Sequence, residues 1–275
     1  MSGSAECGSA FEVRRGELAA GGCRLSYLEW QAEGPAVLLL HGITSSARTW
    51  WRTAETLAQH GYHVYALDLP GHGQSDEAAD YDIDRLGALV AEAIAQLGLE
   101  RPHLIGHSWG GAMALALASA PEPPALASVT LIDPAMAMNP ERGAEILPFY
   151  SEGVGEPPEQ TLPPLRARNP DWHPCDFYWK GEALQQCRRE AVRAAFTSGA
   201  GWMLAARPAE VQARLLVLVA DPQHTVIPAA MLPAIEQALR PDLGELRVLP
   251  GTNHNMLRGG FDQTMPVLLE WIGRQ

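Results

Sequence analysis

The sequence has little that would mark a secreted, membrane-spanning or metal-binding protein. Its first ten residues carry no basic flank and no apolar core, so we expect no secretory signal peptide. No apolar run approaches the length that crosses a bilayer. The four cysteines, Cys7, Cys23, Cys175 and Cys187, lack metal-ligand spacing. We therefore expect a cytoplasmic protein with reduced thiols, while a bridge between Cys175 and Cys187 stays open.

Positive charge and nucleotide-binding motifs are also scarce. The net charge of −12 argues against nucleic acid and against anionic membrane surfaces as partners. The patterns G-x-x-x-x-G-K-[ST], G-x-G-x-x-G and H-E-x-x-H do not occur. We expect no nucleotide, no metal and no other cofactor, and a small-molecule substrate as the partner. The sequence does not determine the oligomeric state.

Strand patterns alternate with helical patterns along most of the 275 residues, which predicts an α/β fold class. A hairpin-like start at 11–18 and 23–30 precedes apolar runs typical of strands buried on both faces, at 36–40, 62–67, 126–132 and 214–220. Helical spacing follows them over 47–60, 84–97, 229–239 and 261–272. We expect a mostly parallel sheet with helices on both faces. In such sheets ligands bind beyond the carboxyl ends of the strands.

The pattern changes between residues 134 and 208, where prolines and aromatic residues gather. Helical pieces are plausible around 141–150, 182–195 and 202–206. We interpret this segment as an inserted, mostly helical cap. The predicted core domain therefore consists of residues 1–133 and 209–275, and the cap of residues 134–208.

The stretch Gly106-His-Ser-Trp-Gly110 lies between a short buried strand and a run of small helix formers, and it fits the G-x-S-x-G nucleophile elbow. A serine on so tight a turn has a strained backbone, and its neighbours need glycine. The following helix points its N-terminus at the serine and favours an anion there. Ser108 is therefore the predicted nucleophile. Its best base is His254, in the loop between the last strand and the last helix.

Four motifs together resemble the α/β-hydrolase superfamily: His41-Gly42 after the first buried strand, Asp68-Leu-Pro-Gly-His-Gly73 after the next, the elbow, and Pro250-Gly-Thr-Asn-His254. The resemblance covers roughly residues 36–134 and 212–273. It implies the α/β-hydrolase fold and the chain order serine, acid, histidine. It also implies that the backbone N–H groups of Ile43 and Trp109 form the oxyanion hole.

The acid departs from the usual pattern of the superfamily. The segment after the strand that ends at Ala220 is Asp221-Pro-Gln-His-Thr-Val-Ile-Pro228. Aligning Pro228 with the family proline puts His224 in the place of the acid and Asp221 three residues early. Some branches place the acid after the strand that follows the elbow helix, where this chain has Asp133. We predict Asp133 as the acid, and Asp221 stays open as the alternative.

Other polar residues near these motifs have structural interpretations. We expect His41, His72 and Asp68 to support the loops beside the oxyanion hole, and His107 to pack under the elbow. Tryptophans and methionines gather near the motifs, namely Trp50, Trp51, Trp109, Met136 and Met138. If half of them face the cleft, the pocket is apolar and adaptable, while for Trp51 and Trp202 we expect a place in the core or at the cap interface.

The predicted activity is that of a carboxylesterase that cleaves an apolar ester through an acyl-enzyme. A carbon–carbon bond hydrolase and a cofactor-free haloperoxidase also use a serine and remain alternatives. Haloalkane dehalogenation and epoxide hydrolysis need a carboxylate nucleophile, which Ser108 is not. A non-catalytic ligand-binding protein of the same fold is the alternative from a different class.

Overall fold

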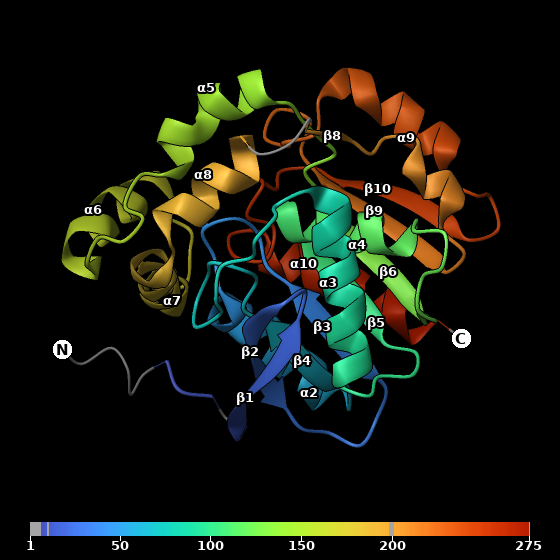
Figure 1. The fold of residues 1–275 in the computed structure, drawn as a ribbon, viewed down its shortest axis with the longest axis horizontal. Coiled ribbons are helices and arrows are strands. Elements are labelled where there is room, and N and C mark those ends of the chain that lie inside the picture. The colour runs from blue at the N-terminus through green and yellow to red at the C-terminus, as the bar shows by residue number, and fades with distance from the viewer. Residues whose placement is uncertain (1–6, 10, 198–200, 275) are drawn as a thin grey trace.

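A computed structural model describes residues 7–9, 11–197 and 201–274. An eight-stranded sheet in the order β1-β2-β4-β3-β5-β6-β9-β10 forms its centre (Figure 1). The strands β1 (Val13–Ala20) and β2 (Cys23–Trp30) form the expected hairpin, and β2 pairs antiparallel with β4 (His63–Leu67). The remaining pairs are parallel and join β4 to β3 (Ala36–Leu40), β5 (His103–His107), β6 (Ser128–Ile132), β9 (Arg214–Ala220) and β10 (Gly244–Leu249).

Helices cover both faces of this sheet, as predicted, because successive residues of each buried strand point to opposite sides. On β3, Leu38 and Leu40 pack with α3 (Ile83–Gln96) and α4 (Trp109–Ala118), while Val37 and Leu39 pack with α2 (Trp51–Gln59) and α10 (Phe261–Gly273). Figure 1 shows α3 and α4 in front of the sheet and α10 behind it. The remaining core elements are η1 (Ala47–Trp50), η3 (Ala229–Met231) and α9 (Leu232–Ala238). The predicted α/β-hydrolase fold class is confirmed.

The segment between β6 and β9 lies to one side of the sheet (Figure 1). It contains β7 (Ala137–Met138), α5 (Pro140–Tyr150), α6 (Pro158–Arg168), α7 (Pro174–Gln186), α8 (Arg189–Thr197), β8 (Trp202–Met203) and η2 (Arg207–Glu210). The prediction of a helix at 202–206 is wrong, because β8 pairs antiparallel with β7 there. No helix was expected over α6, since Pro163 and Pro164 lie inside it.

The prediction of four reduced thiols is also wrong. Cys7 and Cys175 form a disulfide with their Cα atoms 5.3 Å apart, whereas Cys23 and Cys187 are free. The Cys175–Cys187 bridge, which the sequence left open, is therefore not formed. Sequence spacing does not show which thiols meet in space. Disulfides are typical of oxidising compartments, so the expected cytoplasmic location loses the support that it drew from reduced thiols. Within the described residues, no helix has both the length and the apolar character needed to cross a bilayer.

Candidate active site

Ser108 stands on the turn between β5 and α4, in a backbone conformation that side chains rarely adopt, with φ 53° and ψ −116°. Its N–H donates to Ile132 O on the neighbouring strand at 3.0 Å. The flanking glycines are needed for space. A Cβ on Gly106 would lie 2.3 Å from Gly110 O, and one on Gly110 would lie 2.3 Å from Leu40 O. Close packing of helix on strand therefore fixes the strained turn and points the serine at the carboxyl edge of the sheet.

His254 connects the serine to a buried carboxylate. Its Nε2 lies 3.0 Å from Ser108 Oγ, and its Nδ1 lies 2.7 Å from Asp133 Oδ2. The three side chains come from the ends of β5 and β6 and from the loop after β10. An ionised carboxylate only accepts hydrogen bonds, so Nδ1 carries the proton and Nε2 is free to accept the one from the serine. The structure thus brings together the three predicted side chains in the order that proton removal from a serine requires.

Asp133 is fully buried and its carboxylate accepts further hydrogen bonds. Oδ1 accepts from Ala220 N and Thr225 Oγ1, and Oδ2 accepts from Val226 N. Burial by itself raises the pKa of this carboxyl, but the hydrogen bond and charge of His254, with those from Thr225 and Ala220, bring the pKa below its ordinary value. The group is therefore held as an anion that orients the histidine.

Asp221, the alternative acid, has different partners. Its carboxylate accepts from Gln223 N and Gly251 N, each at 3.0 Å, and these bonds lower its pKa. It thereby ties the turn after β9 to the loop that carries His254. The turn after β9 is where the resemblance to the superfamily would place the acid. In this chain it supplies Thr225 and Val226, which donate hydrogen bonds to Asp133. Sequence reasoning did not find these two supporting residues.

The predicted oxyanion donors lie on either side of the serine. Trp109 is the first residue of α4, and Ile43 follows Gly42 in the loop after β3. Across the described ranges, neither backbone N–H donates to a protein acceptor, so both are available to an oxyanion. Thr44, Ser108 and Asp133 are the three described non-glycine residues with positive φ. Backbone strain is thus concentrated at this one edge of the sheet.

Buried histidines hold the loops around the site. His72 Nε2 accepts from Thr44 N at 3.1 Å, and His41 Nε2 accepts from Leu69 N at 3.0 Å. Burial lowers the pKa of each to about 3, so both stay neutral and can accept. His107 Nε2 donates to the backbone oxygen of His254 at 2.8 Å. Asp68 accepts from Ala47 N at 2.8 Å. These contacts are structural, as expected from the sequence.

Two cavities meet at Ser108 and differ in character. The larger one, of about 940 Å³, is lined by apolar side chains, among them Trp109, Met138, Ile146, Phe196, Trp202 and Ile227, and by Arg142 and Glu145, which form an ion pair with each other. The other, of about 570 Å³, is called the polar cavity below, because the cationic side chains of Arg168, Lys180 and Arg258 line it. Of the residues expected near the pocket, Trp109 and Met138 line the larger cavity, whereas Trp50 and Met136 are buried in the core. Trp51 donates to Asp176 of the cap, as expected at the cap interface, and Trp202 both packs against the core and lines the larger cavity.

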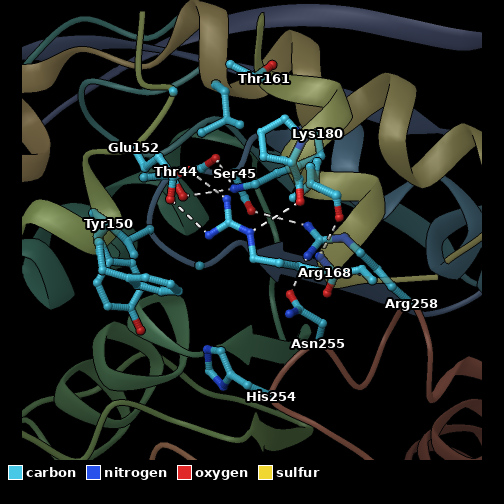
Figure 2. A pocket seen from close by; sticks show the side chains of 18 of the residues that line it. Thr44, Ser45, Tyr150, Glu152, Thr161, Arg168, Lys180, His254, Asn255 and Arg258 are labelled. Atoms are coloured by element: carbon cyan, nitrogen blue, oxygen red, sulfur yellow. Dashed lines mark hydrogen bonds and ion pairs between the residues drawn. The ribbon is translucent and has the colours of Figure 1, made fainter. Parts of the chain in front are cut away.

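Sequence reasoning missed two cations in the polar cavity (Figure 2). Lys180 of α7 donates from Nζ to Thr44 O at 2.7 Å and to Thr44 Oγ1 at 2.8 Å. Arg258 donates to Asn255 Oδ1 at 2.6 Å and to Ser45 Oγ at 3.4 Å. Two features of the sequence could have pointed to these residues. Lys180 is the only lysine in the chain, and Arg258 lies in the same loop as His254, shortly after it.

Comparisons with known proteins agree with this architecture. The family model for the alpha/beta hydrolase fold matches residues 35–162. An N-formylmaleamate deformylase from Pseudomonas putida is 34% identical over 189 residues, which are 67% of this chain and 69% of the relative.

Solved structures show the same fold. An E-2-(acetamidomethylene)succinate hydrolase superposes with a TM-score of 0.78 at 21% identity, over 96% of this chain and 100% of that one. An esterase from Exiguobacterium antarcticum superposes with a TM-score of 0.76 at 16% identity, over 94% of this chain and 99% of that one. With its fold, its strained elbow and these relatives, the chain belongs to the α/β-hydrolase superfamily.

Proposed function

We propose that the protein is a serine hydrolase that cleaves carboxylic esters through an acyl-enzyme. The observation that carries the proposal is the hydrogen-bonded series from Asp133 through His254 to Ser108, at the point where two cavities meet. Ser108 is the proposed nucleophile, His254 the base and Asp133 the group that orients it. The two backbone N–H groups of Ile43 and Trp109 are the proposed oxyanion donors.

The reaction follows from this geometry. Ser108 Oγ attacks the carbonyl carbon while Nε2 of His254 takes its proton. The carbonyl oxygen becomes an oxyanion and accepts from the N–H groups of Ile43 and Trp109. The protonated histidine, stabilised by Asp133, then gives its proton to the leaving alcohol. Water, deprotonated by His254 in turn, attacks the acyl carbon and releases the acid and the free serine.

Hydrolytic deformylation is the second candidate, since the relative with 34% identity is an N-formylmaleamate deformylase. The same serine, base and oxyanion donors would act, with a nitrogen leaving group in place of an alcohol. A hydroxyl nucleophile already hydrogen-bonded to a base argues against a purely ligand-binding role.

The test is turnover of p-nitrophenyl butyrate and of N-formylmaleamate by the purified protein and by Ser108→Ala. Where deacylation is the slow step, an acyl-enzyme releases p-nitrophenol in a burst whose amplitude approaches the enzyme concentration, and Ser108→Ala is expected to release none above background. Turnover of the ester alone supports the esterase, and faster turnover of the formyl compound supports the second candidate. Turnover of neither compound, across short and long acyl chains, would overturn both.

A further inference from the structure

The polar cavity beside Ser108 contains two cations that no protein carboxylate neutralises. Lys180 and Arg258 both line this cavity, and within the described chain neither forms an ion pair with an acidic side chain. Arg168 in the same cavity differs, because both of its terminal nitrogens lie 2.9 Å from the oxygens of Glu152 (Figure 2). The cavity therefore has one compensated and two uncompensated positive charges.

The partners of the two cations are neutral oxygens. Lys180 donates to Thr44 and Arg258 donates to Ser45 and Asn255, and the Arg258 guanidinium also lies 4.5 Å from the centre of the Trp172 ring. The charge of Asp176 acts on Arg258 from a distance and partly offsets its positive charge, but the two side chains form no ion pair. The Asp176 carboxylate instead accepts a hydrogen bond from the indole N–H of Trp51. Removing a cation from water without a counter-ion is costly, so an anionic ligand between the two cations would offset a cost that the protein itself leaves uncompensated.

The charge of the whole chain makes this arrangement more specific. The protein has a net charge of −12 and a single lysine among its 275 residues. That lysine lies at the oxyanion loop, in hydrogen-bond contact with the residue after Ile43. Burial lowers the pKa of Lys180 to about 7, and the charge of Arg258 lowers it further. An anion between the two cations would reverse both effects, since a counter-charge favours the protonated amine.

We propose that Lys180 and Arg258 form an anion subsite, and that the natural substrate carries a carboxylate group as well as the bond that Ser108 attacks. The carboxylate occupies the polar cavity, and the remainder of the substrate extends into the larger cavity, which also reaches Ser108. This inference rests on the proposed hydrolytic function. A singly charged carboxylate fits better than a phosphate dianion, because two cations without an ion pair are found among the described lining residues, and Glu152 and Glu156 lie in the same lining.

The kinetic test compares ester pairs that differ only in charge. Monoethyl esters of dicarboxylic acids with four to eight carbons are matched with the corresponding carbamoyl esters, and a second set places the carboxylate on the alcohol side of butanoate esters. Proton release at pH 7 gives kcat/KM for each compound. We expect the acid to be preferred over its carbamoyl partner by about tenfold or more at the best chain length.

Variants then assign the preference to the two cations. Arg258→Gln and Lys180→Met are expected to reduce the acid-to-carbamoyl ratio to near one, and Arg258→Lys is expected to restore part of it. Arg48→Gln is the matched control, because it removes one positive charge of a partly buried arginine that lines neither cavity. No preference in the parent protein, or a preference that survives both variants, would overturn the proposal. Circular dichroism shows whether each variant is folded.

Binding can be measured without turnover, because the chain has one lysine. Protein grown with [ε-¹³C]lysine gives a single side-chain signal, from Lys180. In Ser108→Ala, glutarate is expected to shift this signal towards the charged form and to raise the pKa of Lys180, whereas glutaramide leaves it unchanged. Inorganic phosphate tests the alternative anion, and a stronger shift with phosphate than with any dicarboxylate would contradict the carboxylate assignment.

The two proposals can fail separately. If the proposed hydrolysis fails, neither p-nitrophenyl butyrate nor N-formylmaleamate is turned over, yet dicarboxylates still move the Lys180 signal. If the anion subsite fails, the neutral ester is hydrolysed while the lysine signal does not respond and the ester pairs are equivalent.

Discussion

Lys180 of α7 donates hydrogen bonds to both oxygens of Thr44, at 2.7 Å to the carbonyl and 2.8 Å to the hydroxyl. Thr44 adopts a positive φ of 59° and its N–H is held by His72, so its position is determined from the core and from the cap together. The residue before it is Ile43, a proposed oxyanion donor. The cap is thus connected to the sheet edge that carries Ser108 through a side chain that can gain or lose a proton.

The first prediction concerns pH. With a pKa of about 7, Lys180 is charged below pH 7 and neutral well above it. Other groups that act on it are Arg258, which stays charged, and Cys187, whose pKa burial raises to about 12, so that it stays a neutral thiol. We expect the acid-to-carbamoyl ratio of kcat/KM to fall severalfold from pH 6 to pH 8.5.

The ratio is the informative quantity, because a pH effect on the catalytic step that the two esters share cancels in it. In Lys180→Met the ratio is expected to be small and independent of pH, since Arg258 keeps its charge throughout. A parent ratio that stays flat over this range, or one that rises with pH, would contradict the role given to Lys180.

The second prediction separates the two aspartates. Asp133→Asn is expected to lower kcat for p-nitrophenyl butyrate by about 10⁴-fold, the loss found for the orienting acid of a serine protease. The asparagine side chain carries no negative charge, and its NH₂ group would face backbone N–H donors such as those of Ala220 and Val226, which now donate to the carboxylate. Asp221→Asn keeps an acceptor for the loop and is expected to stay within about tenfold of the parent. Equal losses in the two variants would show that loop support, and not the anion, is what Asp133 provides.

Much of the site could be predicted because its signals are local or follow from the topology. The elbow glycines lie next to Ser108 in sequence, and the carboxyl ends of parallel strands meet at one edge, which brings Asp133 and His254 to the same place. The cap was predicted less well. Helix α6 contains internal prolines, and β8 is a strand only because β7 lies beside it. Lys180 and Arg258 meet in one cavity through packing between the cap and the core, which no sequence period encodes.

The third prediction tests the close packing at the elbow. A methyl group on Gly110 would lie 2.3 Å from Leu40 O and 2.6 Å from His41 O, both of them backbone atoms. Gly110→Ala is therefore expected to destabilise the fold by about 3 kcal/mol or more, the upper range for overpacking, and to abolish turnover. Gly98→Ala is the control, since Gly98 has a φ of +65° but a methyl group added there would meet no other part of the protein within 4 Å.

In Gly98→Ala only the positive φ is unfavourable for the added side chain. We therefore expect the free energy of unfolding to fall by about 1 kcal/mol and kcat to stay unchanged. Urea unfolding measures the two free energies. Similar values for both variants would mean that the elbow adjusts to the extra methyl group, and that the strand and helix do not constrain Ser108 as tightly as their contacts suggest.

The last prediction concerns the disulfide between Cys7 and Cys175, which closes a loop with a sequence separation of 168 residues. A cross-link over a loop of this length restricts the unfolded chain and typically contributes about 2–4 kcal/mol. Cys7→Ser is expected to lower the unfolding free energy by that amount, while Cys23→Ser, which leaves the bridge intact, changes it little. Thiol titration in denaturant should find two free thiols, those of Cys23 and Cys187, before reduction and four after it. Four thiols in protein purified under oxidising conditions would show that the bridge does not form, and the cytoplasmic location expected from the sequence would regain its support.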